Sequence, residues 1–175
     1  MADNMNSNHM NSGNRNFYQR GTNTGRDNKI FKPVPAPRIN ISGAKIEGQL
    51  FSERAQEAAK ACAAEALAAK KKVKFAKEVN KPAQLRRFYD ELVMWHDKVF
   101  AKQTQQERQE EFLKFLPYIQ MLRAKAAYAK GRTRINETFY GMFDNLIEQV
   151  NSPEHLKRAR LFMEALLGYL KYYGV

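Results

Sequence analysis

The side chains that usually carry catalysis or bind metals are few in this chain and lie far apart. Its single cysteine, Cys62, excludes both a disulfide within the chain and a multi-cysteine metal site. The three histidines are distant from one another in sequence: His9, His96 and His155. A nuclease would need a metal or an acid–base pair. The adjacent pairs His96–Asp97 and Glu154–His155 are expected to point in different directions on a helix, so we expect no catalytic activity, metal or other cofactor.

Positive charge is the dominant chemical feature of the sequence. The 175 residues include 30 Lys+Arg against 18 Asp+Glu, a net charge of +12, which favours a polyanionic partner. The stretch 112–136, FLKFLPYIQMLRAKAAYAKGRTRIN, contains no acidic residue and six basic ones: Lys114, Arg123, Lys125, Lys130, Arg132 and Arg134. On a helical wheel its expected buried stripe consists of Phe115, Tyr118, Ile119, Leu122, Ala126 and Ala129.

The expected outer face of this helix is small and bordered by cations on both sides. It consists of Pro117, Gln120, Ala124, Ala127 and Gly131. Arg123 and Lys130 flank the buried stripe on one side, and the remaining flanking cations lie on the other: Lys114, Lys125 and Arg132. A phosphate backbone could approach such a face closely and be held from two edges. The alternative is a solvated helix that is rich in alanine for its helix propensity.

Two further basic groups are candidates for ligand binding. Arg86 and Arg87 each precede an acidic residue by four positions, so ion pairs within the helix compete with a ligand for them. Because an arginine placed before the acid is the weaker order for such pairs, both arginines remain candidates. In the first turns of the last helix, three cations oppose the helix dipole, which is typical either of binding or of simple solvation: Lys157, Arg158 and Arg160.

The apolar pattern predicts an all-α fold, a small bundle of five or six helices. The first helix is expected to begin with Ser52 as its cap, follow a thin seam of alanines and end in the lysine-rich run 70–77. The second begins near Pro82, and His96 on its apolar face is interpreted as a core or boundary residue. The third begins with a capping box at Thr104 and Glu107.

The third helix is expected to kink or break at Pro117 and to stop at Gly131. Two more helices are predicted over 136–150 and 152–174. The last is apolar on more than one face, so it is either central in the bundle or covered by a partner.

The chain divides into an extension and a helical domain. Residues 1–51 are predicted to be a disordered, basic extension and linker, rich in Asn and Pro, and 52–175 the helical domain. Arginines lie near Phe17 and Tyr18 in the extension, which is a mild signal for single-stranded nucleic acid. The N-terminus does not read as a secretory signal, and no apolar run is long enough to span a bilayer. We therefore expect a cytoplasmic protein without a membrane partner.

Three segments together resemble the small subunit of type III-A CRISPR effector ribonucleoproteins, the Csm complexes. They are QLRRFYDEL, LPYIQMLRAKAAYAKGR and FMEALLGYLKYYG, and the resemblance covers residues 75–174. It implies a non-catalytic helical subunit that stacks in several copies and binds the backbone of CRISPR RNA and its paired target RNA. The implied protein partners are the backbone and large subunits of the complex. The extension and most of the alanine-rich helix have no counterpart in this resemblance.

The resemblance places RNA contacts in the segments that match QLRRF and RAKAAYAKGR. The candidate RNA-binding residues are therefore Arg86, Arg87, Arg123, Lys125, Lys130 and Arg132, to which charge alone adds Arg134. The alternative function is a helical protein–protein scaffold whose basic charge serves solubility. Charge reversal at Arg123, Lys130 and Arg132 is expected to abolish RNA retention under the first reading and to leave it intact under the second.

Overall fold

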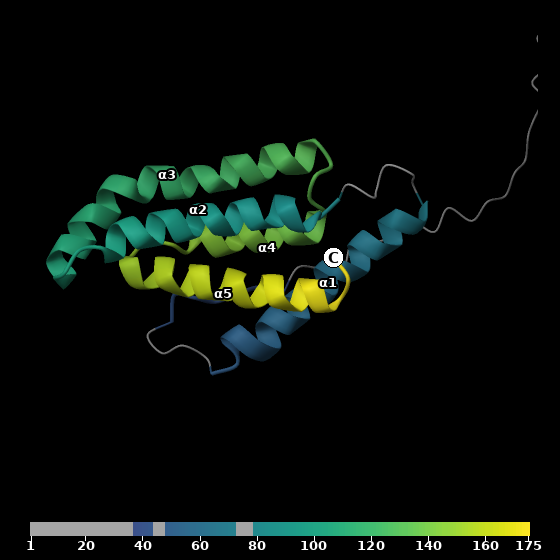
Figure 1. Ribbon diagram of the computed structural model, residues 1–175, viewed down its shortest axis with the longest axis horizontal. Helices are drawn as coiled ribbons and strands as arrows, with labels where there is room; N and C mark the ends of the chain where they lie inside the picture. Colours follow the sequence, from purple (N-terminus) through teal and green to yellow (C-terminus); the bar gives the residue numbers. More distant parts are fainter. Residues whose placement is uncertain (1–36, 44–47, 73–78) are drawn as a thin grey trace, which may run out of the picture. The chain divides into compact units, whose positions relative to one another are not determined.

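The computed structural model describes residues 37–43, 48–72 and 79–175, and their regular structure is helical (Figure 1). A short π-helix, η1 (Leu50–Arg54), precedes five α-helices: α1 (Ala55–Lys72), α2 (Pro82–Phe100), α3 (Gln105–Gly131), α4 (Glu137–Glu148) and α5 (Pro153–Tyr172). No strand occurs in these described ranges. The all-α prediction is confirmed. The arginines and aromatic residues noted in the extension lie outside the described residues.

Helices α2 to α5 begin where the local sequence predicts. Pro82 occupies the first turn of α2. Thr104 and Glu107 form the reciprocal capping box of α3: the Glu107 N–H donates to Thr104 Oγ1 at 3.2 Å, and the Thr104 N–H donates to Glu107 Oε2 at 3.0 Å. These bonds to Thr104 lower the pKa of Glu107. Asn136 and Ser152 cap α4 and α5 with their side-chain oxygens. Each cap pairs an orphan backbone N–H group at a helix start.

One predicted helix start is wrong, because helical structure begins at Leu50, two residues before the expected cap at Ser52. A kink or a break was expected at Pro117, and the break does not occur, because α3 continues through this residue. Figure 1 shows that the ribbon of α3 is bent in its N-terminal half. Of the predicted lysine-rich helix end, residues 73–78 lie outside the described residues.

Helix α5 is covered by two neighbouring helices. It packs against both α1 and α2, whereas α3 packs mainly against α4 and α2 (Figure 1). The buried residues of α5 include Leu156, Phe162, Met163, Leu166 and Leu170. This position explains why α5 is apolar on more than one face: two neighbouring helices cover it from different sides.

The segment 37–43 lies on the bundle, held by a buried arginine of α5. Ile39 and Ile41 belong to the core, with exposed fractions of 3% and 1%. Arg158 Nη1 donates to the carbonyl oxygens of Ile41 at 2.8 Å and Gly43 at 2.6 Å. Gln149 Nε2 donates to the Ile39 carbonyl at 2.6 Å. Arg158, which the sequence left open as a binding residue, therefore has a structural role.

Helix α1 is attached to the start of α4 through polar groups. Asn136 Nδ2 donates to the Cys62 carbonyl oxygen at 2.9 Å. The Glu65 carboxylate accepts from the backbone N–H groups of Glu137 and Thr138 at 3.2 and 2.9 Å. A negative charge at a helix N-terminus is stabilising, so Glu65 strengthens both the start of α4 and its contact with α1. This contact fixes the end of the α3–α4 loop, which follows the last basic residues of the 112–136 stretch.

Candidate nucleic-acid interface

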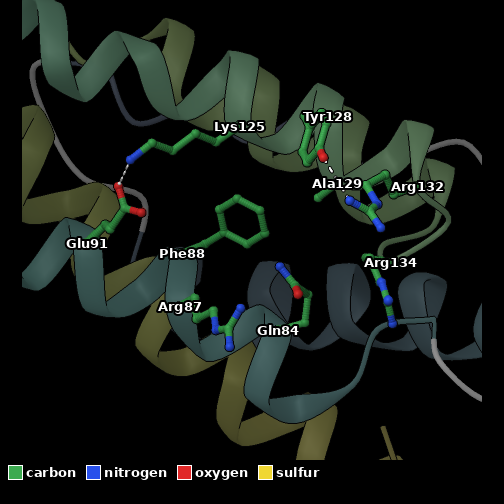
Figure 2. Close-up of a pocket in the computed structure, with 9 residues that line it drawn as sticks. All are labelled: Gln84, Arg87, Phe88, Glu91, Lys125, Tyr128, Ala129, Arg132 and Arg134. Carbon is green, nitrogen blue, oxygen red and sulfur yellow. Dashed lines mark hydrogen bonds and ion pairs between the residues drawn. The ribbon is translucent and has the colours of Figure 1, made fainter.

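A groove of about 560 Å³ lies between the first half of α2 and the second half of α3. The two helices are antiparallel, so the QLRRF segment of α2 comes to lie opposite the RAKAAYAKGR segment of α3. Figure 2 shows the nine side chains that line the groove: Gln84, Arg87, Phe88 and Glu91 from α2, and Lys125, Tyr128, Ala129, Arg132 and Arg134 from α3 and the loop after it. This groove joins the two segments that the sequence analysis singled out separately.

The floor of the groove is apolar and belongs to the hydrophobic core. Phe88 and Ala129 have exposed fractions of 5% and 6%. The Phe88 ring contacts Phe143 and Phe139 of α4, with centroid distances of 5.0 and 5.9 Å. Buried aromatic contacts of this kind keep the floor in place. The groove therefore has a fixed apolar floor beneath a polar rim.

The rim combines cations with one exposed aromatic ring. Arg132 Nη1 donates to Tyr128 Oη at 2.8 Å. This hydrogen bond raises the pKa of Arg132, so its guanidinium keeps its charge. At the other end of the groove, Lys125 Nζ donates to Glu91 Oε2 at 2.6 Å. Figure 2 shows these two contacts at opposite ends, with Arg134 beside Arg132 and Arg87 on the facing helix.

Arg86 and Arg87 have different surroundings although they are adjacent in sequence. Arg86 forms an ion pair with Asp90 at 3.5 Å, as the four-residue spacing allows. Its side chain lies outside the groove, on a surface that it shares with Leu167 and Leu170 of α5. The corresponding pair of Arg87 with Glu91 is not formed, because Glu91 binds Lys125. Within the described part of the chain, Arg87 has no hydrogen-bond or ion-pair partner. Its guanidinium is the one best placed to receive an anion.

Arg123 and Lys130 lie on the opposite flank of α3, against α4. Arg123 binds Asp144 through two hydrogen bonds of 2.8 and 3.0 Å, which raise the pKa of Arg123. Lys130 Nζ lies 2.5 Å from a carboxylate oxygen of Glu137 and 4.7 Å from the Tyr140 ring centroid. The two flanks of α3 therefore differ: one forms ion pairs with α4, and the other faces the groove.

Four of the seven predicted RNA-binding residues meet in the groove and three lie elsewhere. The four are Arg87, Lys125, Arg132 and Arg134, and the three are Arg86, Arg123 and Lys130. An RNA-binding role stays a prediction for all seven residues. The structure shows which of them can act together on one ligand.

The expected orientation of α3 holds for most of the helix, since Ile119, Leu122, Ala126 and Ala129 are buried, but it is wrong at two positions. Tyr118, expected in the buried stripe, is 53% exposed. Gln120, expected on the outer face, donates through Nε2 to the carbonyl oxygens of Ile147 at 3.0 Å and Val150 at 3.1 Å. The exposed face includes the expected Pro117 and Ala124, and it also includes Leu113, Met121 and Tyr128. Gln120 is partly buried because α4 packs against that side of α3.

Sequence reasoning missed Tyr128 and Gln84 as groove residues. Tyr128 is 65% exposed and lies one helical turn before Arg132. The proximity of arginine to an aromatic ring was the signal applied to Phe17 and Tyr18 in the extension. Applied to Tyr128, the same signal would have found this residue. Gln84 carries no comparable signal, and its place in the groove follows from the packing of α2 against α3.

The histidines and the helices give no further site among the described residues. His96 Nδ1 lies 2.9 Å from Asp97 Oδ1, so the expectation that this pair diverges is wrong. The His96 ring also stacks on Phe100, with a centroid distance of 4.4 Å, as suits a boundary residue. In the described ranges no three His, Cys, Asp or Glu side chains are grouped to hold a metal ion. No helix there has both the length and the apolar character to cross a membrane.

Comparison with known proteins gives one match. The family model described as Csm2 Type III-A matches residues 51–175. No curated protein and no solved structure matches the chain. The match includes the alanine-rich helix α1, so the expectation that most of this helix lacks a counterpart in the family is wrong. It includes every residue of the groove as well.

Proposed function

The chain belongs to the Csm2 type III-A family, the small subunits of type III-A CRISPR effector complexes, and from this premise we propose that it binds RNA through the α2–α3 groove. In this proposal the subunit is non-catalytic and acts in the cytoplasm. Several copies stack beside the backbone and large subunits. The groove cations hold the backbone of CRISPR RNA and its paired target RNA.

The observation that carries this proposal is the convergence of four cations on one groove. They come from α2, α3 and the loop after α3, and among the residues that line the groove one is acidic, Glu91. Charge that served solubility alone would be spread over the surface, whereas phosphate binding needs several cations within reach of one backbone. Arg87 supports the proposal further, since no carboxylate among the described residues neutralises it.

In this proposal the protein recognises the phosphates and the shape of the RNA, because the guide RNA reads the target sequence by base pairing. Binding should therefore depend steeply on salt and little on base identity. The check compares a poly-U strand with a mixed-sequence duplex of equal length at fixed salt. A difference in affinity of about a thousandfold would contradict backbone recognition.

The test of the groove itself is a charge-matched pair of variants. Arg87→Gln with Arg132→Gln removes two groove cations, and Lys60→Gln with Lys157→Gln removes two exposed cations from α1 and α5. We expect the groove variant to bind duplex RNA about tenfold more weakly and to lower the slope of log K against log salt by about 2. The control should keep both quantities close to wild type. Equal losses in the two variants would show that net charge, and not the groove, binds RNA.

A protein–protein scaffold is the second candidate, and the exposed face of α3 favours it. Leu113 and Met121 on this face have exposed fractions of 55% and 51%. The structure also changes the test that separates the two candidates. Charge reversal at Arg123 or Lys130 would break ion pairs with α4, so a loss of RNA retention would be ambiguous. Arg87 and Arg132 are the informative positions, because neither pairs with a carboxylate among the described residues.

A further inference from the structure

We propose that the α2–α3 groove holds one unpaired nucleotide of the bound RNA, with its base stacked on Tyr128. Its phosphates would lie toward the end of the groove with Arg132 and Arg134, within reach of Arg87 on the facing helix. This inference rests on the proposed RNA-binding function and adds to it a ligand for the apolar part of the groove. It also assigns Tyr128 as a binding residue.

The first argument is the apolar floor. Phosphates alone would be held by a basic surface, and desolvating them over Phe88 and Ala129 would be unfavourable. A nucleobase is flat and has an apolar face, so it gains from covering such a floor. The groove volume of about 560 Å³ lies within the range of roughly 300–1,000 Å³ that is typical of small-molecule sites. One nucleotide fits such a volume better than a length of duplex does.

The second argument is that one ring face of Tyr128 is open to a base. The ring is 65% exposed. Arg132 contacts the hydroxyl group at 2.8 Å, and its Cζ atom lies 5.7 Å from the ring centroid. A guanidinium at these two distances sits beside the hydroxyl edge and does not cover the ring face. Exposed aromatic rings next to cations are the usual platforms for unpaired bases.

The third argument is the charge difference between the two ends of the groove. Lys125 and Glu91 form an ion pair at one end, which is therefore close to neutral. The other end carries Arg132 and Arg134, and Arg87 lies between the two ends on the facing helix (Figure 2). A nucleotide has the same asymmetry, with a neutral base and an anionic phosphate. Charge thus orients the nucleotide, with its phosphate toward Arg87 and Arg132.

A base inside a duplex has both faces covered by its neighbours, so the nucleotide in the groove must lie outside the stack. The protein should therefore prefer a duplex that contains one unpaired nucleotide to a fully paired duplex of equal length. Stacking on one aromatic ring is expected to give a preference of about tenfold. A site for backbone phosphates alone would show no such preference.

The experiment uses the full chain and two RNA duplexes of equal length, one fully paired and one with a single unpaired 2-aminopurine nucleotide. Wild type should prefer the second duplex and quench the fluorescence of 2-aminopurine, which is sensitive to stacking. Tyr128→Leu should lose both the preference and the quenching, and Tyr128→Phe should keep both because the ring remains. Tyr118→Leu is the matched control, an exposed aromatic residue of the same helix that lies outside the groove.

Two results would overturn the inference. One is equal affinity of wild type for the two duplexes, and the other is an unchanged preference in Tyr128→Leu. The Arg87→Gln, Arg132→Gln double variant separates this failure from failure of the proposed function. If the double variant weakens binding of both duplexes while Tyr128→Leu weakens neither, the groove binds backbone alone. If the double variant behaves like its charge-matched control, RNA binding by the groove fails altogether.

Discussion

Lys125 of α3 donates a hydrogen bond of 2.6 Å to Glu91 of α2, although Arg87 lies one turn before Glu91 on the same helix. This contact has two effects on the groove. It neutralises one end, and it leaves the Arg87 guanidinium without its expected partner. A contact between helices has thus replaced the ion pair within the helix that the sequence allows.

Removing the Glu91 carboxylate is expected to strengthen RNA binding. Glu91→Gln releases Lys125 and removes the one negative charge that lines the groove. We expect affinity for duplex RNA to rise roughly three- to tenfold at moderate salt, as one more cation becomes available to phosphate. Asp90→Asn is the control, because it changes the net charge equally but releases Arg86, which lies outside the groove. Equal gains in the two variants, measured by fluorescence anisotropy, would contradict the assignment.

Arg123 is expected to contribute to stability and not to RNA binding. Its two hydrogen bonds to Asp144 connect α3 to α4, but its side chain is 35% exposed, so solvent weakens the pair. We expect Arg123→Gln to lower the free energy of unfolding by about 1 kcal/mol. Its RNA affinity should stay within about twofold of wild type, unlike that of Arg132→Gln. Urea unfolding and RNA titration of the same preparations check both parts. A tenfold loss of RNA affinity in Arg123→Gln would return this residue to the interface.

Arg158 is expected to hold the segment 37–43 on the bundle. Arg158→Met keeps much of the side-chain length but leaves the carbonyl oxygens of Ile41 and Gly43 without their charged donor. We expect a loss of about 2–3 kcal/mol in the free energy of unfolding. Trypsin cleavage after the exposed Arg38 should also become faster, since the segment that contains it loses its anchor. Lys157→Met, at an exposed neighbouring position, should cost less than about 0.5 kcal/mol. Similar stability losses in the two variants would refute the anchoring role.

Cys62 is expected to make stability fall with rising pH in the alkaline range. Burial, together with the nearby charge of Glu65, raises the pKa of the Cys62 thiol far above its ordinary value of 9.0. Above pH 9 the unfolded chain therefore loses this proton while the folded chain keeps it, and ionisation favours the unfolded state. The added slope should approach about 1.4 kcal/mol per pH unit. Urea unfolding between pH 8 and pH 10 should show a smaller slope for Cys62→Ala than for wild type. Identical slopes would show that other groups cause the decline.

Local sequence was sufficient to place the starts of α2 to α5 and to select the acid-free basic stretch. Thr104, Asn136 and Ser152 act within one turn of their own helices, so their role as caps needs no distant neighbour. The same holds for the acid-free stretch 112–136, which is visible in composition alone. The α3 segment of the groove is predicted from this composition, and the QLRRF segment from its arginines and the family resemblance.

The surroundings of individual residues at the borders of the buried stripe of α3 could not be obtained in the same way. A helical wheel gives the angles between residues about one axis, but how far a neighbouring helix covers the borders depends on which helices pack there. Gln120 caps the end of α4, which packs on its side, and Tyr118 is exposed. Arg158 shows the same limit, since its partners at Ile41 and Gly43 lie more than a hundred residues away in sequence.

The sequence by itself determined the all-helical class, the starts of α2 to α5, the excess of positive charge and the family resemblance. These follow from local propensity and composition, which act over a few residues. The tertiary structure alone decided which cations share a groove and which are engaged in ion pairs with a neighbouring helix. The physical reason is that an ion pair such as Lys125–Glu91, or an apolar floor such as Phe88 with Ala129, joins residues on different helices. Their contact depends on helix packing, and no spacing along the chain encodes it.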